Sequence, residues 1–509
     1  MNRVLFLDDM DVLCTTGLTR RPHKAVKHLQ NPLLVNEHPW ERYRCQLVGT
    51  SVIHDPIAGK FHMYYIASPE PGHYPSININ GQNKPGHTTL PAYAESDDGV
   101  GWTKPMLGQC TFNDCRDTNL LPFVVGQSFE CGAMYDSYER DSSRRFKLLW
   151  WGQSCEMHIA KGTVTRENGN AHGFDSVVRD DRGEVLSRHH VTLPGDWFVD
   201  VAFSPDGIHW KRHPAHVFLG ASDTGQSILF DPRLSRYVAF GRFHARPMKK
   251  GGSNIEVGRA VGRIESNDFI HWSDTELVVC PDLNDPPNTQ FNSMPVTLYE
   301  GLYIGAIELG GSVSLPWLPM QLATSRNGRH WTRVGDRFDF LDLGDEGQWD
   351  EGAIRPGSGL LIAGDEMRIY YSTINRKSLP QSRHIDGPRA PGIGMASWRR
   401  DGFVSLHADL NGGGGELVTK PFIPDGEELF LNVDAADGQV TVEVCSSHSM
   451  TPDAQLPSKN RVSHPLRINA TAAPVRWMDG NISNITRPGF PISLRIRMAN
   501  ADLYSFWTE

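Results

Sequence analysis

The sequence lacks a long apolar run, a dense cysteine pattern and an excess of positive charge. No apolar stretch approaches the roughly 20 residues that cross a bilayer, so we expect no membrane span. Asp8, Asp9 and Asp11 interrupt the short apolar start, which predicts that no signal peptide is present. The formal net charge of −9 disfavours nucleic acid or an anionic membrane as the main partner.

Cysteine and histidine are present but form no metal-binding pattern. The eight cysteines are scattered, and only Cys110 and Cys115 are close, without a second pair or a histidine at zinc spacing. The 21 histidines include no HExxH motif. We therefore expect no metal and no cofactor, and reduced thiols in a cytoplasmic protein that can form a homo-oligomer. A secreted protein that has lost its signal is the rival interpretation.

Length and composition indicate a globular protein with more than one core. At 509 residues the chain exceeds the size at which a single core usually stops growing, so two domains are expected. Its hydrophobic fraction of 39% and charged fraction of 21% are ordinary for globular proteins.

A short motif, Ser-x-Asp/Asn-Gly-x-x-Trp, recurs along the chain. Asp-Gly and Asn-Gly between apolar strands are strong hairpin signals because glycine accepts a positive φ. In the third copy Phe269 replaces the glycine, and a degenerate fifth copy around Asp401 lacks the tryptophan. The four fuller copies occupy residues 96–102, 204–210, 266–272 and 325–331.

A strand rich in aromatic and β-branched residues precedes each copy of the motif. These strands occupy residues 61–65, 146–151, 237–240, 302–307 and 367–371, and each follows a tight turn after an earlier strand. Four strands in each of five repeats predict an all-β fold, a five-bladed β-propeller over residues 1–408. Five unrelated hairpins on a sandwich are the alternative.

The pattern changes after the glycine run 412–415. Alternating apolar and polar residues follow, for example at 428–433, 439–444 and 492–498, without a helical stretch. This alternation predicts a C-terminal β-sandwich domain over residues 409–509.

Loop lengths distinguish the two faces of the predicted propeller. The turns between strands 1 and 2 of each repeat are short, whereas the connections between strands 2 and 3 are long, at 68–91, 152–196, 243–255, 309–320 and 374–391. Long loops on one rigid face are where binding and catalysis are usually found. Asp55, followed by Pro56, lies at a short turn and is repeated as Asp231 and Asp136, so we interpret it as a turn former.

Residues that lead into each innermost strand are expected to line the central funnel. Several carboxylates gathered there would have their pKa values pushed apart, which suits an acid paired with a base or nucleophile. Each could instead cap a strand or pair with an arginine. The carboxylate candidates are Glu130, Asp223, Glu351 and its neighbour Asp350, with Glu41 and Glu308 in reserve.

Further polar and aromatic residues are candidates for substrate binding. Arg242, His244 and Arg259 form a local basic group that could recognise a carboxylate or sulfate on a sugar, or could neutralise the funnel carboxylates. Asn292 also leads into the funnel. Trp197 and Trp317 stand on long loops and could stack on sugars or simply pack the loops.

The blade pattern, the Asp-Gly turns and the C-terminal β domain resemble glycoside hydrolase family 32 and its five-bladed relatives. The resemblance lies in residues 95–99 with Trp102, residues 321–328 and the ending 501–506. It implies an Asp nucleophile, a stabilising Asp and a Glu general acid followed by Cys, which Glu130-Cys131 matches locally, but in the second blade rather than the third. The family's Trp-Met-Asn-Asp-Pro-Asn-Gly and Arg-Asp-Pro boxes are absent, so a fructan substrate is not implied.

These observations predict a glycoside hydrolase that acts in the exo mode on a small oligosaccharide in the funnel. Glu130 is the expected acid, Asp223 a base, nucleophile or stabiliser, and Glu351 or Asp350 the other carboxylate. Two alternatives remain open. One is a lyase or dehydratase that acts on a uronic acid through His244 or a tyrosine, and the other is a sugar-binding propeller without catalysis.

Overall fold

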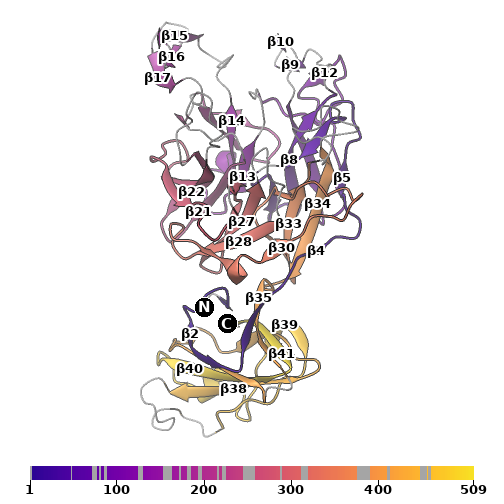
Figure 1. The fold of residues 1–509 in the computed structure, drawn as a ribbon. Coiled ribbons are helices and arrows are strands. Elements are labelled where there is room, and N and C mark those ends of the chain that lie inside the picture. Colours follow the sequence, from indigo (N-terminus) through magenta and orange to yellow (C-terminus); the bar gives the residue numbers. More distant parts are fainter. Residues whose placement is uncertain are drawn as a thin grey trace.

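The computed structural model describes an almost wholly β-stranded chain (Figure 1). The one α-helix that it shows is the single turn α1, Ile482–Ile485, and 3-10 turns occur at η1, Ser142–Arg144, and η3, Val334–Asp336. The described residues are 3–47, 49–70, 77–79, 82–84, 89–123, 130–152, 163–170, 173–179, 185–192, 198–214, 217–219, 225–244, 258–286, 289–310, 319–374, 390–409, 413–446, 456 and 460–509.

Five consecutive antiparallel units, which we number 1 to 5, fill residues 44–399. Unit 1 contains β6 (Arg44–Gln46), β7 (Val52–Asp55), β8 (Lys60–Ser68) and β11 (Leu90–Ser96). Unit 2 contains β13 (Cys131–Tyr135), β14 (Phe146–Gly152), β18 (Phe198–Ser204), β19 (Lys211–Arg212) and β20 (Phe218–Leu219). Unit 3 contains β21 (Ser227–Asp231), β22 (Arg236–His244), β23 (Arg259–Ser266) and β24 (Glu276–Val279).

Units 4 and 5 repeat the same order. Unit 4 contains β25 (Gln290–Ser293), β26 (Val296–Tyr299), β27 (Leu302–Gly310), β28 (Met320–Ser325), β29 (Thr332–Arg333) and β30 (Asp339–Leu341). Unit 5 contains β31 (Arg355–Pro356), β32 (Leu361–Ala363), β33 (Glu366–Ser372) and β34 (Ala390–Arg399). Its outermost strands come from the start of the chain, as β4 (Val26–Lys27) and β5 (Leu34–Val35).

Smaller pieces complete the inventory of this part. One three-stranded sheet contains β9 (Ile77–Ile79), β10 (Gln82–Lys84) and β12 (Thr111–Phe112), and another contains β15 (Thr163–Asn170), β16 (Gly173–Arg179) and β17 (Val185–Thr192). β6 of unit 1 also pairs in parallel with β34 of unit 5, so these two units share one ten-stranded sheet.

The units close on one another through their apolar faces. In the described part of the chain, separate buried clusters join units 1 and 2, units 2 and 3, units 3 and 4, units 4 and 5, and finally units 5 and 1. Tyr370 of unit 5, for example, lies in one cluster with Met63 of unit 1. Burial of apolar area is the main favourable term in folding, so each interface between units contributes its own share of the stability.

Hydrogen bonds also connect the innermost segments of all five units. At Gly49 φ is +83°, and a Cβ there would lie 2.2 Å from the Cys131 carbonyl oxygen, so only glycine allows units 1 and 2 to approach this closely. The connecting bonds are Thr50 N to Gln226 O, Ala133 N to Thr50 O, Ser51 N to Gly357 O, Val296 N to Ser227 Oγ, and Leu360 N to Thr297 Oγ1.

The repeated motif forms the same turn four times. The serine Oγ accepts a hydrogen bond of 2.9 Å from the backbone N–H at the glycine position in every copy. The Asp or Asn side chain accepts the next two backbone N–H groups, and the tryptophan Nε1 donates back to the carbonyl at the glycine position over 2.9–3.2 Å. Local side-chain bonds of this kind fix a turn independently of the surrounding strands.

Phe269 shows that the third copy keeps this geometry without glycine. Its φ is +68°, in the left-handed region that costs an L-residue about 1–2 kcal/mol. The ring is fully buried and packs edge-on against Tyr237 and Trp272. Burial of a phenylalanine side chain is worth roughly 1.5–3 kcal/mol, which offsets that strain.

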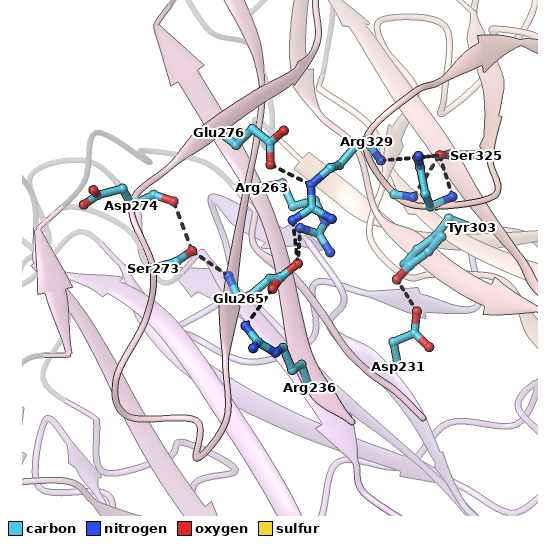
Figure 2. A network of polar contacts seen from close by, with 12 residues as sticks. Asp231, Arg236, Arg263, Glu265, Ser273, Asp274, Glu276, Tyr303, Ser325 and Arg329 are labelled. Carbon is cyan, nitrogen blue, oxygen red and sulfur yellow. Dashed lines mark hydrogen bonds and ion pairs between the residues drawn. The ribbon is translucent and has the colours of Figure 1, made fainter. Parts of the chain in front are cut away.

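Units 3 and 4 are also joined by a polar network at the ends of their outer strands (Figure 2). Arg263 is buried, and its Nη1 lies 2.5 Å from Glu265 Oε1, to which Arg329 Nη2 also donates over 2.8 Å. Arg236 reaches the other oxygen of the same carboxylate, and Arg329 also contacts Glu276. One glutamate therefore pairs with three guanidinium groups from two units.

Two further sheets form the rest of the molecule, below the five units in Figure 1. One contains β35 (Val404–Ala408), β37 (Leu429–Asp434), β39 (Asn469–Pro474) and β41 (Ala501–Thr508), with β1 (Val4–Leu5) and β3 (Thr19–Pro22). The other contains β2 (Val12–Thr16), β36 (Gly415–Thr419), β38 (Gln439–Ser446) and β40 (Ile492–Ala499).

The pairing of the first strands differs from the predicted division at residue 408. Strands β1, β2 and β3 are hydrogen-bonded to β41, β36 and β35, so residues 4–22 belong with the C-terminal sheets rather than with the five units. β35, at residues 404–408, also pairs with β41, so these residues belong with the C-terminal sheets although the prediction assigned them to the propeller domain. The physical reason is that these short strands find open sheet edges only among strands far away in the sequence, which local periodicity does not reveal.

Asp401 joins the C-terminal sheets to unit 4. Its side chain is buried and accepts hydrogen bonds from Arg3 Nη1 over 2.9 Å, from Ser505 Oγ over 2.6 Å, and from the Tyr299 hydroxyl. Tyr299 belongs to unit 4, and Arg3 and Ser505 come from near the two ends of the sequence. A single carboxylate thus connects three distant segments.

Replacement of Asp401 with alanine should destabilise the protein strongly. The change leaves the Arg3 guanidinium and two hydroxyls buried without their acceptor, and loss of one partner of a buried ion pair costs about 3–5 kcal/mol. Urea denaturation followed by tryptophan fluorescence measures the shift. Asp409→Ala is the control, because the Asp409 side chain is 74% exposed and its loss should change stability by less than about 0.5 kcal/mol. Equal shifts for the two variants would contradict this role.

Asp206, in the second turn, should make stability depend on pH. Burial raises its pKa, but hydrogen bonds from the His209 backbone and ring outweigh burial and lower the pKa to about 2. A depressed pKa in the folded state gives stability that is present above the unfolded pKa and lost as pH falls towards 2. Because the side chain is 44% exposed, we expect less than about 1 kcal/mol.

The natural asparagine of the fourth turn supplies a matched pair of variants. Asp206→Asn should keep the turn, as Asn327 does, and its stability difference from the wild type should shrink between pH 5 and pH 3. Asn327→Asp should be more stable than the wild type at pH 5, and this advantage should shrink as the pH falls to 3. Urea denaturation at both pH values measures the effect, and a difference that does not change with pH would contradict it.

Candidate functional site

The five innermost segments have two ends with different polar residues. We call the end at which β6, β13, β21, β25 and β31 begin the leading end, and the other the trailing end. At the trailing end Asp55 Oδ1 accepts backbone N–H groups of Ile57 and Ala58 over 2.8 and 3.2 Å, which confirms its interpretation as a turn former. Asp231 likewise contacts Arg233 two residues on.

Glu41 is buried near the leading end, and its carboxylate is fully engaged. It forms an ion pair of 2.9 Å with Lys104 and accepts the backbone N–H groups of Glu37 and His38 over 3.0 Å. The Tyr65 hydroxyl also donates to it. Burial, followed by the charge of Glu41, raises the pKa of Tyr65 well above its usual range, so the phenol stays a donor. These contacts indicate a structural role.

Asp350 and Glu351 are held by contacts within and beside unit 5. Asp350 is buried, with Lys27 Nζ at 2.6 Å and the Tyr371 hydroxyl at 2.9 Å. Lys27 belongs to the outermost strand β4. Glu351 is half-buried and accepts the backbone N–H of Gly347 over 2.6 Å, which is a local turn contact. These contacts with Lys27, Tyr371 and Gly347 indicate structural roles for both carboxylates.

Glu308 forms a buried ion pair at the leading end, between units 4 and 5. The Arg355 Nε atom lies 2.8 Å from Glu308 Oε1, and Ser293 Oγ donates to Oε2 over 2.6 Å. The Glu308 side chain is 1% exposed and that of Arg355 12%. Ser293 lies on β25, directly across from Glu308 on β27, and Arg355 begins β31.

Asn292 meets two arginines of unit 3. Arg259 Nη1 donates to its side-chain Oδ1 over 2.8 Å, and Arg242 donates to its backbone carbonyl from Nε and Nη2 over 3.3 and 3.2 Å. The register between β25 and β27 shifts between Phe291 and Ser293, so Asn292 is the extra residue of an irregular pairing. Bulges of this kind turn a side chain towards a new direction and are frequent beside functional sites.

Glu130 directly precedes β13 and is half-buried at the leading end. Burial raises the pKa of the neighbouring Cys131 to about 12, and the charge of Glu130 adds to that shift. Cys131 is therefore a protonated thiol, not a nucleophile.

Several predicted residues are not described. Asp223, Trp197 and Trp317 lie outside the described residues, and of His244 only the strand position in β22 is given. Each stays a prediction. Sequence reasoning did not select Arg355 or Ser293; an alignment of the starts of the innermost strands could have found Arg355, because it occupies the same position in unit 5 as Arg44 does in unit 1.

Among the residues with assigned positions, no group of three His, Cys, Asp or Glu side chains is arranged to hold a metal ion. The seven described cysteines are free thiols. No described helix has the length and hydropathy required to cross a bilayer.

The ion pair of Glu308 and Arg355 gives a stability prediction. Arg355→Met should destabilise the protein by about 3–5 kcal/mol, because it leaves a buried carboxylate without its cation. The double variant Arg355→Met/Glu308→Leu should recover much of this loss, since replacement of a whole buried pair by apolar residues is often neutral. Urea denaturation measures both. Additive losses would show that the two side chains do not interact.

Comparisons with known proteins found fold neighbours only. The sequence matches no protein-family profile and no curated protein. Among solved structures, a "Glycoside hydrolase" aligns over 75% of this chain and 92% of its own with 12% identity and a TM-score of 0.42. The alignment with β-1,2-mannobiose phosphorylase from Listeria innocua covers 74% of this chain and 96% of the other, at 12% identity and a TM-score of 0.43. The alignment with an N-acetylgalactosamine deacetylase from F. plautii covers 76% of this chain and 97% of the other, at 14% identity and a TM-score of 0.41. Likeness at this level carries no argument about activity, and the resemblance to family 32 stays a prediction.

Proposed function

We propose that the five units are the blades of a five-bladed β-propeller, that the two remaining sheets form a β-sandwich, and that the chain is a carbohydrate-active enzyme of the glycoside hydrolase kind. The propeller is supported by the apolar clusters between all neighbouring units, including units 5 and 1, and by the bonds among the innermost segments. The outermost strands β4 and β5 from the start of the chain complete unit 5, the last repeat.

One observation carries the location of the site. At the leading end, buried polar side chains run from unit 3 through unit 4 to unit 5. They follow the order Arg242 and Arg259, Asn292 and Ser293, Glu308, and Arg355.

Burial of such charges costs several kcal/mol for each ion, and at the leading end several of them gather from three neighbouring units. At the trailing end Asp55 and Asp231 are used by turns, and Lys147 forms a buried ion pair with Asp136 of the same unit. The leading end is therefore the better candidate for a functional site.

The proposed chemistry uses two carboxyl groups in different environments. Glu130 is the general acid, which gives its proton to the oxygen of the leaving sugar as the bond from that oxygen to the anomeric carbon breaks. Water supplies the hydroxyl group of the new anomeric end. Glu308, paired with Arg355, is a candidate for the second role: base, nucleophile or stabiliser of the positively charged transition state. Asp223 is an equal candidate for this role.

Two other features of the proposal come from the sequence. The long connections on this side, such as 243–255 and 309–320, favour a pocket closed at one end and hence exo action on chain ends. A glycoside hydrolase either retains or inverts the configuration of the anomeric carbon. The acid and the second carboxyl group lie about 5–5.5 Å apart in retaining enzymes and about 6.5–9.5 Å apart in inverting ones. The anomeric configuration of the first product, followed by NMR, distinguishes them.

Glu130→Gln should lose about 10²–10⁴-fold in kcat, because a positioned general acid contributes this much to bond cleavage. The assay is release of sugar from a panel of neutral and uronate-bearing oligosaccharides. Glu308→Gln should lose activity on the same substrate. Glu95→Gln is the control, since Glu95 pairs with Lys60 away from the leading end.

Three outcomes would change the proposal. Full activity of Glu130→Gln on the substrate found would remove Glu130 as the acid. An increase in ultraviolet absorbance during turnover would indicate an unsaturated product and replace hydrolysis with elimination. Binding of a saccharide without turnover would leave a binding protein.

A further inference from the structure

The side-chain amide of Asn292 has only one possible orientation. Arg259 Nη1 is a donor, so the atom that it meets at 2.8 Å has to be the amide oxygen. The amide nitrogen, Nδ2, consequently faces the other way. It is buried, and no described residue accepts a hydrogen bond from it.

A buried donor without an acceptor destabilises a fold, because the group loses its hydrogen bonds to water and gains none in return. Asn292 is 1% exposed, so bulk water does not remove this cost. Its position is also rigid, because Arg242 holds its backbone carbonyl from two nitrogens while Arg259 holds its side chain. The unmet donor is thus fixed in place at the leading end, next to Ser293 and the Glu308 pair.

The surrounding groups define what would complement this donor. The Asn292 amide nitrogen and the two guanidinium groups are all donors, and a guanidinium has no acceptor. A sugar hydroxyl both donates and accepts, whereas a carboxylate or a sulfate only accepts and carries the charge that arginine recognises in a planar, two-point contact. The match is better for an oxyanion than for a neutral sugar.

We propose that Asn292, Arg259 and Arg242 form a subsite that binds an anionic substituent of the saccharide, a carboxylate or a sulfate. The inference rests on the proposed function, because it takes the leading end to be the saccharide site. It adds the substrate class: uronate-bearing or sulfated sugars. Asn292 Nδ2 donates to one oxygen of the anion, beside the two guanidinium groups that hold the Asn292 backbone and side chain.

Calorimetric titration of the full chain with matched probes tests the subsite. Each probe set contains a methyl hexoside, the corresponding hexuronic acid and the 6-sulfate, with inorganic sulfate as a fourth ligand. We expect one of the two sugar anions to bind about tenfold or more tightly than the neutral sugar, as charged hydrogen bonds require. Comparison of the hexuronic acid with the 6-sulfate shows which of the two anions the subsite binds.

Asn292→Asp is the most direct variant, because it keeps the acceptor for Arg259 and replaces the unmet donor with a second carboxylate oxygen. It should remove the preference for the anion, about tenfold in affinity or more, with little change for the neutral sugar. Arg259→Gln should reduce the same preference. Arg329→Gln is the charge-matched control: it also removes an arginine, but one that contacts Glu265 and Glu276 in the network of Figure 2.

The outcomes separate this inference from the proposed function. If a neutral saccharide is cleaved and neither anion binds more tightly, the subsite is wrong while the proposed function stands. If a sugar anion binds through Asn292 but no saccharide is cleaved, the subsite stands without catalysis. If inorganic sulfate binds as tightly as the sugar anions, the site does not recognise the anion as part of a sugar, and the inference is wrong. An Asn292→Asp variant, with an unchanged unfolding midpoint, that still prefers the anion would also overturn it.

Discussion

The buried carboxylate of Asp401 is the contact on which the arrangement of the whole chain depends. It accepts bonds from Arg3 and Ser505, which lie side by side at the paired strands β1 and β41, and from Tyr299 of unit 4. Each donor is buried at that point and would be left without an acceptor if the segments separated. Because an unmet buried charge costs several kcal/mol, the C-terminal sheets and unit 4 are held in one relative position. Asp401 itself adopts φ +59°, a strain that persists only where surrounding contacts determine the backbone.

Local chemistry explains why much of the fold could be predicted from the sequence. The Ser-x-Asp-Gly-x-x-Trp turn carries all of its hydrogen bonds within seven residues, so its recurrence in the sequence is recurrence in the structure. The strand before each turn has alternating or wholly apolar residues, because it lies between two of the buried apolar clusters that join neighbouring units. What could not be predicted is long-range pairing: the partners of β1, β2 and β3 are hundreds of residues away, and no periodicity marks them.

The candidate site was predictable in residue type more than in role. The carboxylates selected from the sequence stay predictions as site residues, and the structure shows that their surroundings differ. Glu41 is bound by Lys104 and Tyr65, Asp350 by Lys27 and Tyr371, and Glu308 by Arg355, which leaves its other oxygen to Ser293. Lys27 and Arg355 come from other segments of the chain, so the sequence around each carboxylate does not show which charge will neutralise it. The bulge that turns Asn292 is likewise a property of two strands together.

The pairing of β1 with β41 has a consequence for the order of folding during synthesis. Val4 and Leu5 are synthesised long before their partners Phe506 and Ser505. The repeating units can assemble one after another as they emerge, since each is built from neighbouring strands. The sheets that contain both ends of this sequence have to wait until synthesis reaches β41. Until those partners are made, the strands within residues 4–22 are unpaired, so chaperones can bind them and they can pair with the wrong sheet edges.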